Sequence, residues 1–217
     1  MPTSSGGRRP GVRIPKKAPP RSVGTRERLV RAAIDLFREQ GFHATGISEI
    51  LWKADARRSS LYHHFPGGKD ELATAAITLA GEEYWERVEA TWDAQADAVR
   101  GVREVFEVAA DRLEATDYAE ICPIATIALD VAGTRNELRM AVARVIEEWL
   151  DSASRRLILA GASDNVATAS SHTIIVMLEG AFLLCRTLKD TAPMRDAAGV
   201  AATLVRTALA TGEPPPG

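Results

Sequence analysis

Apolar residues recur at helical spacing along most of the chain. Leu29, Leu36 and Phe37 mark one face of a helix, and Gly41 is a typical helix terminator, so the pattern predicts a first helix from about Thr25 to Gly41. The same periodicity predicts further helices over about 47–54, 58–64, 69–93, 97–116, 136–160, 163–189 and 193–210, with a short helix after Cys122-Pro123.

Runs that alternate β-branched or aromatic residues with polar ones, the pattern typical of strands, are almost absent. Ala, Leu, Glu and Arg are abundant through the middle and end of the chain, and these residues favour helices. We therefore expect an all-α protein. Hydrophobic residues make up 46% of the 217, enough for a substantial core.

The segment 46–69 predicts two short helices joined by a tight turn. Asp55 stands where such a turn needs a left-handed residue, a conformation that Asp tolerates. The second of these helices opens with Arg57 and Arg58 and continues with Tyr62, so its polar side suits phosphates and base edges. A helix-turn-helix places its second helix in the DNA major groove. The segment therefore predicts a DNA-binding protein.

The charge distribution supports a two-part molecule. Residues 1–69 contain 14 Lys and Arg against five Asp and Glu, whereas residues 70–217 contain 13 against 24. The net charge of −2 hides this contrast between a basic first third, which suits a polyanion, and an acidic body. Residues 1–24 contain no acid and few apolar side chains, which predicts a disordered basic arm that adds phosphate contacts or remains a solvated tail.

The sequence does not support several other classes of protein. Cys122 and Cys185 make neither a disulfide framework nor a zinc site, and His63-His64 has no third ligand at suitable spacing. We find no nucleophile–base pair and no cofactor loop, so we expect no enzyme, metal or cofactor. No apolar run approaches the ~20 residues of a membrane span, and no signal core follows the basic N-terminus. We therefore expect a cytoplasmic protein with no membrane partner.

The motifs around this segment resemble the TetR family of bacterial transcriptional regulators. They are Phe37-Arg-Glu-Gln-Gly41-Phe42, Ala44-Thr45, Ile47-Ser-Glu-Ile50 and Leu61-Tyr62-His63-His64-Phe65, followed by Lys69 and Leu72. Pro66-Gly67-Gly68-Lys69 and Cys122-Pro123-Ile124-Ala125 resemble a subgroup that includes regulators of drug-efflux operons in Gram-positive bacteria. The resemblance implies a three-helix DNA-binding domain followed by a helical domain that binds an effector and dimerises. The chain departs from the family with Asp55 in place of Gly and with Ser59-Ser60 in place of Lys-Gly.

The candidate DNA contacts follow from the side-chain chemistry of this segment. Arg can bind guanine bidentately, hydroxyls can bind bases or phosphates, and His and Lys suit phosphates. The free N–H groups at the start of the helix that begins at Lys69 could help to clamp a phosphate. The candidate residues are Thr45, Arg57, Arg58, Ser59, Ser60, Tyr62, His63, His64 and Lys69.

The acidic, helical remainder predicts a sensor for a small apolar effector. A ligand that favours a wider spacing of the two recognition helices would lower DNA affinity by population shift. Ordinary core packing is the alternative role for each candidate pocket residue. The candidates are Trp85, Trp92, Phe106, Trp149, Met177 and Phe182.

The expected organisation has four parts: an arm at 1–24, a helix-turn-helix domain at 25–68, an effector-binding and dimerisation domain at 69–211, and a disordered tail at 212–217. A two-fold operator calls for a homodimer, which we expect through about 163–189 and 193–210, where Gly180 and Ala181 permit close approach. The function expected is a dimeric repressor released from operator DNA by its effector. The alternative is a constitutive or nonspecific DNA-binding protein without a ligand, which would bind all sequences about equally.

Overall fold

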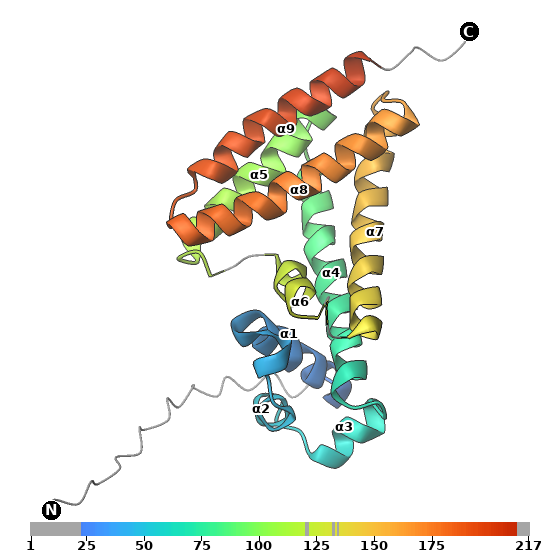
Figure 1. Cartoon of the computed structure of the whole chain (residues 1–217), viewed down its shortest axis with the longest axis vertical. Helices are drawn as coiled ribbons and strands as arrows, with labels where there is room; N and C mark the ends of the chain where they lie inside the picture. Colours follow the sequence, from blue (N-terminus) through green and yellow to red (C-terminus); the bar gives the residue numbers. More distant parts are fainter. Residues whose placement is uncertain (1–22, 120–121, 132, 134, 212–217) are drawn as a thin grey trace, which may run out of the picture.

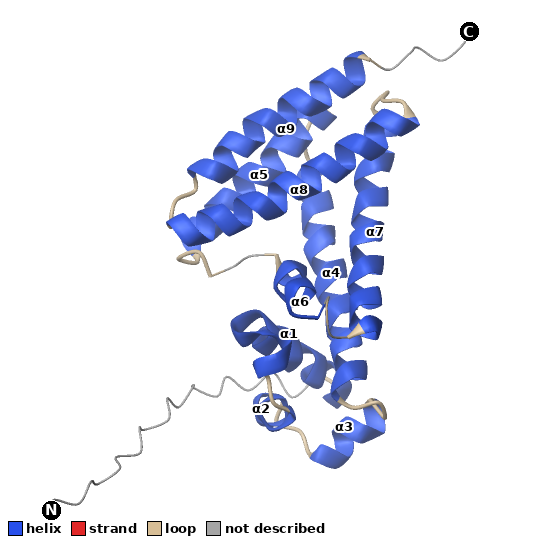
Figure 2. Ribbon diagram, in the orientation of Figure 1, coloured by secondary structure: helices blue, strands red, loops and turns tan. Residues whose placement is uncertain are grey.

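The computed structural model describes residues 23–119, 122–131, 133 and 135–211, and within these ranges it contains nine α-helices and no strand (Figures 1 and 2). This confirms the all-α expectation. The tail at 212–217 and nearly all of the arm at 1–24 lie outside the described residues. The helices are α1 (Thr25–Ala44), α2 (Ile47–Lys53), α3 (Arg58–His64), α4 (Lys69–Asp93), α5 (Ala98–Ala115), α6 (Pro123–Val131), α7 (Asn136–Leu159), α8 (Asp164–Leu188) and α9 (Ala192–Ala210).

Helices α1 to α3 pack around a small apolar core at one end of the molecule (Figure 1). Phe37, Ile50, Leu61 and Phe65 are almost completely buried in it. Gly41 interrupts α1 with a left-handed φ of 82°, so the helix breaks where the sequence predicted its end and the chain then turns into α2.

The turn between α2 and α3 has the predicted left-handed residue. Asp55 adopts a φ of 49°. Arg28 of α1 holds this turn from the inside, because its Nε donates a hydrogen bond to the Ala54 carbonyl at 3.0 Å and thereby satisfies an acceptor at the end of α2. The angle between α2 and α3 is thus fixed by both a backbone conformation and a side-chain cap.

Helix α4 links the end formed by α1 to α3 to the remaining helices, packing against α1 at its beginning and against α7 and α5 further along (Figure 1). Two glycines allow these close approaches. A Cβ on Gly81 of α4 would lie 2.4 Å from Val145 Cγ1 of α7, and a Cβ on Gly101 of α5 would lie 2.4 Å from Trp92 Cδ1 of α4. Glycine is therefore required where α4 meets α7 and where it meets α5.

The other end of the molecule is a layer of long helices in which α8 packs on both α7 and α9, and α9 packs on α5 (Figure 1). Helix α8 is apolar and long enough to cross a membrane by length and composition, but 44% of its most apolar window is buried within this protomer. Burial against two neighbouring helices accounts for part of that apolar character. The rest lies on an exposed face of α8 that carries Val176, Leu184 and Leu188.

Candidate DNA-binding surface and effector cavity

Helix α3 presents a polar, uncapped first turn to solvent. Arg57 occupies the N-cap position, and the side chains of Arg57, Arg58 and Ser59 are exposed. No acidic residue lies in this turn, so the positive end of the helix is not neutralised locally. Among the described residues, neither Arg57 nor Arg58 has a side-chain hydrogen bond or an ion pair, so both guanidinium groups are available to a ligand.

The side chains in the second turn of α3 differ in their exposure. Tyr62 is 44% exposed, and its ring packs beside Gly68, where an added Cβ would lie 3.5 Å from Tyr62 Cε1. His63 is exposed, whereas His64 and Ser60 are half-buried. The two imidazole rings meet edge to face at 5.0 Å between centroids. The sequence-predicted contacts Arg57, Arg58, Ser59, Tyr62 and His63 therefore share one accessible surface, with Ser60 and His64 at its margin.

Thr45 does not belong to this surface. Its side chain is only 2% exposed, and its hydroxyl donates to the Gly41 carbonyl at 2.7 Å. Thr45 closes the bend between α1 and α2, so its predicted role as a phosphate contact through the hydroxyl is wrong for this conformation. The sequence does not distinguish the two roles, because a threonine that follows a helix-ending glycine can either bury its hydroxyl in the bend or expose it at the start of the next helix.

Lys69 also differs from the prediction. Its Nζ donates a hydrogen bond to the Phe42 carbonyl at 2.6 Å and lies 4.0 Å from the centroid of the Phe42 ring. Burial lowers the pKa of this ammonium group from its ordinary value. Lys69 therefore ties the start of α4 to the end of α1, and its charge points inward rather than toward a phosphate.

A cavity of about 930 Å³ lies between the end of α1 and helices α6, α7 and α8. Its apolar wall includes Ile124, Ile146, Trp149, Ile175 and Phe182, and its polar lining includes Arg38, Glu179 and Arg186. This volume is in the range of pockets that hold drug-sized ligands. A second, much smaller cavity of about 70 Å³ lies on the other side of Phe182, beside Tyr84, Val105 and Pro123.

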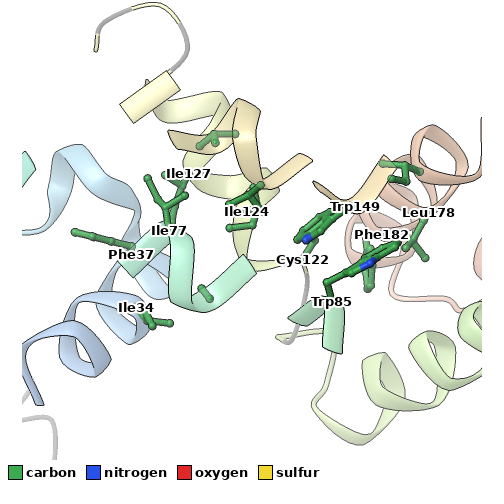
Figure 3. Packing of buried hydrophobic residues seen from close by; sticks show 14 of the residues in the cluster. Ile34, Phe37, Ile77, Trp85, Cys122, Ile124, Ile127, Trp149, Leu178 and Phe182 are labelled. Carbon is green, nitrogen blue, oxygen red and sulfur yellow. The ribbon is translucent and has the colours of Figure 1, made fainter. Parts of the chain in front are cut away.

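Two of the six predicted effector residues, Trp149 and Phe182, line the large cavity. Trp85 lies behind Trp149, with the two rings stacked at 5.4 Å and an interplanar angle of 12° (Figure 3). Trp92 and Phe106 line neither cavity and are buried in the core. Met177 also lines neither cavity; it is half-buried and packs against the core.

The cavity contains groups that the sequence reasoning did not assign to it. Glu179 Oε2 is buried and has no hydrogen-bond partner in the described part of the chain. The thiol of Cys122 hydrogen-bonds this carboxyl group, and burial raises the pKa values of both side chains. The available signal was the position of Glu179, the one charged residue in the apolar run 174–184. No cluster of three or more potential metal ligands occurs within the described ranges.

Helix α6 connects the cavity to the end formed by α1 to α3. Its Asp130 carboxylate accepts a hydrogen bond from the backbone N–H of His43 at 2.8 Å. Figure 3 shows Ile124 and Ile127 of α6 between the aromatic group at Trp149 and the apolar residues Ile77 and Phe37. The cavity wall and the end of α1 thus belong to one continuous packed layer.

Family models match both parts of the chain. Residues 29–76 match the model described as bacterial regulatory proteins of the tetR family. Residues 98–200 match the model described as the C-terminal domain of LmrA/YxaF-like transcriptional regulators.

The chain is similar over most of its length to curated regulators. It is 31% identical over 170 residues to the uncharacterized HTH-type transcriptional regulator YxaF of Bacillus subtilis, covering 78% of this chain and 89% of the relative. It is 29% identical to the HTH-type transcriptional regulator LmrA of the same organism, covering 78% and 90%. An uncharacterized HTH-type regulator of Mycobacterium tuberculosis is 34% identical, with 79% and 89% covered.

Solved structures share the fold. A TetR transcriptional regulator from Chloroflexus aurantiacus superposes with a TM-score of 0.70 at 30% identity, covering 84% of this chain and 94% of that one. A TetR-family regulator from Streptomyces coelicolor gives a TM-score of 0.72 at 23% identity, covering 85% and 90%.

Proposed function

Because this chain belongs to the TetR family of bacterial transcriptional regulators, we propose that it is a homodimeric repressor that leaves its operator when a small molecule fills the cavity beside Trp149 and Phe182. The observation that carries this proposal is the pairing of two features. The exposed α3 surface has two guanidinium groups with no partner among the described residues. A drug-sized cavity lies against the end of α1, which α6 also contacts through Asp130.

The DNA-reading part of the proposal rests on α3. Arg57 and Arg58 are at its N-terminal turn, the part of a recognition helix that reaches base edges. Both side chains are exposed and have no partner within the described ranges, which supports base or phosphate contacts. The inward-pointing Lys69 does not support a phosphate clamp. Ser59 and Tyr62 add hydroxyls to the same surface.

The dimer part rests on the outer face of α8 and α9. The apolar side chains of Val176, Leu184, Leu188 and Val200 are each more than half exposed in the protomer, although they lie in long, well-packed helices. Gly180 lies on this face with no atom within 4 Å of an added Cβ, so a partner helix can approach closely. Ala181 is buried inside the protomer and therefore does not belong to this face, contrary to expectation.

The release mechanism uses the contacts of α6. A ligand in the cavity touches α6 and α8, and α6 holds the end of α1 through Asp130. A ligand that prefers one position of α6 therefore biases the orientation of α1 to α3, and its differential affinity sets the change in DNA affinity.

The first experiment is fluorescence anisotropy with DNA from upstream of the protein's own gene and with a scrambled duplex, each at several salt concentrations. The proposal expects tight binding to the upstream duplex alone. Equal binding to both duplexes with a steep salt dependence would instead support the alternative, a nonspecific DNA-binding protein.

A further inference from the structure

Glu179 is placed where an unpaired carboxylate is costly. It lies in the middle of α8 within an apolar run, it lines the large cavity, and its Oε2 is buried with no hydrogen-bond partner among the described residues. Its contact with the Cys122 thiol is a weak one, because S–H is a poor donor. A buried charged acceptor without a strong partner destabilises the protein in which it is found.

Three other half-buried glutamates of this protein have arginine partners. Glu83 pairs with Arg31, Glu89 Oε1 lies 3.0 Å from Arg156 Nη1, and Glu107 Oε2 lies 2.8 Å from Arg195 Nη1. Glu179 has no such ion pair within the described ranges, although arginines line the same cavity. Among the described residues, Glu179 therefore lacks the cation or strong donor that these three carboxylates have.

Building on the proposed function, we propose that the effector is a lipophilic amine whose ammonium group pairs with Glu179 while its apolar body packs against Trp149 and Phe182. The ammonium supplies the hydrogen bond that Oε2 lacks and neutralises the buried charge. A neutral ligand of the same shape would leave that charge in an apolar wall.

The aromatic wall favours the same class of ligand. The Trp149 ring is stacked with Trp85 and lies 5.2 Å from the Tyr84 ring, which makes an electron-rich surface near the carboxyl group. Such surfaces attract organic cations. Arg38 and Arg186 also line the cavity, with no ion partner in the described part of the chain. They repel any cation, so the proposal requires the ammonium group to lie closer to Glu179 than to either guanidinium group, and a second positive charge on the ligand would be repelled. The arrangement fits a single amine on a hydrophobic scaffold.

The test is isothermal titration calorimetry of the full-length protein with three probes that share one scaffold. They are 4-phenylbenzylamine, which is a cation at neutral pH, 4-phenylbenzyl alcohol, which is neutral, and 4-phenylbenzoate, which is an anion. We expect the amine to bind at least tenfold more tightly than either of the others. Equal or weaker binding of the amine, or its failure to bind at all, overturns the inference.

Two variants test whether the preference for the amine comes from the Glu179 carboxyl group. Glu179→Gln keeps the size and polarity but removes the charge, and Glu148→Gln makes the same change at an exposed position of α7 outside the cavity. Glu179→Gln is expected to lose at least tenfold in affinity for the amine but not for the alcohol, while Glu148→Gln binds like the original protein. An unchanged amine affinity in Glu179→Gln overturns the inference.

Operator binding by anisotropy, without and with each saturating probe, separates this inference from the proposed function. If the alcohol or the benzoate releases DNA and the amine does not, the ligand-controlled repressor stands and the cationic effector is wrong. If the amine binds through Glu179 but leaves operator affinity unchanged, the amine site stands and the proposed release mechanism is wrong.

Discussion

At the scale of single residues, the basic side chains of the DNA-binding end divide into two groups. The first group has partners within the protein. Arg28 donates a hydrogen bond to the Ala54 carbonyl, Lys53 forms ion pairs with Asp35 and Glu39, and Lys69 donates a hydrogen bond to the Phe42 carbonyl. Arg57 and Arg58 have no such partners among the described residues. A count of positive charges in the sequence therefore overstates the number that can face DNA.

Arg58→Ala should weaken specific operator binding. Loss of a bidentate base contact costs about 1–3 kcal/mol, roughly 5- to 150-fold in affinity. Arg144→Ala, which removes an exposed arginine from α7, is the control and should bind as the original protein does. The measurement is anisotropy at constant salt. Equal losses on operator and scrambled DNA would show that Arg58 contacts phosphate rather than a base.

Glu179→Gln should stabilise the protein at neutral pH. Burial raises the pKa of Glu179 above its ordinary value of 4.5, so the folded state holds this proton more tightly than the unfolded chain. The stability that depends on the protonated form is therefore present at low pH and lost as pH rises through the folded pKa. Burial also raises the pKa values of its neighbours Cys122 and Tyr84, so both stay protonated in this range.

The gain expected is on the order of 1 kcal/mol at pH 7.5, the scale of cost for an unsatisfied buried acceptor, and it should disappear below about pH 4. Denaturant unfolding across this pH range measures it, with Glu148→Gln as the exposed control. A gain that stays constant with pH would mean that the effect does not come from ionisation of Glu179.

At the scale of helices, the sequence predicted most of the elements and little of their contacts. The spacing of the apolar residues and the helix-terminating residues located the helices to within a few residues. The left-handed residue of the turn between α2 and α3 was correctly predicted at Asp55. The prediction of Trp92 and Phe106 as pocket residues was wrong, because a buried aromatic on a helix stripe has the same spacing whether it faces a cavity or a neighbouring helix. Which of the two applies depends on long-range packing that one sequence does not reveal.

Gly101→Ala tests the closest of these helix contacts. The new Cβ would lie 2.4 Å from Trp92 Cδ1, so α4 and α5 must separate or Trp92 must leave its rotamer. The cost expected is about 1–3 kcal/mol in the free energy of unfolding. Chemical denaturation measures it. An increase in stability, as helix propensity alone would give, would contradict the close packing of these two helices.

Asp130→Ala tests the contact between α6 and α1. Removal of the carboxylate leaves the His43 N–H without the acceptor that it has at 2.8 Å. We expect faster amide hydrogen exchange at the end of α1 and in α6, with α8 and α9 unchanged. Asp164→Ala, at the exposed start of α8, is the control. Unchanged exchange at the end of α1 would show that the packing of α6, rather than this bond, holds the two parts together.

At the scale of the whole molecule, the apolar outer face of α8 and α9 and the polar surface of α3 lie at opposite ends (Figure 1). In the proposed dimer, contact through the α8 and α9 face sets the distance between the two α3 surfaces, so the proposal requires both faces to be intact for a two-fold operator to be bound. The cavity lies between these two faces, at the place where the proposed effector would have to act to change that distance.

Leu184→Glu should give a monomer, because it introduces a charge into the proposed interface at a side chain that does not line the cavity. Light scattering at micromolar concentration should show the mass of one chain, and affinity for the full operator should fall far more than affinity for a half-site. Leu159→Glu, at the exposed end of α7, is the matched control and should remain a dimer. A dimeric Leu184→Glu protein would place the interface elsewhere.

The stacked rings of Trp85 and Trp149 have one more consequence, an optical one. At a centroid separation of 5.4 Å the electronic transitions of the two indole rings couple, and this coupling falls steeply with distance. The pair should therefore give a circular-dichroism couplet that either Trp→Phe substitution abolishes. Because Trp149 forms part of the cavity wall, a molecule that enters the cavity alters the couplet, and the protein carries its own chromophore for following occupancy without any added label.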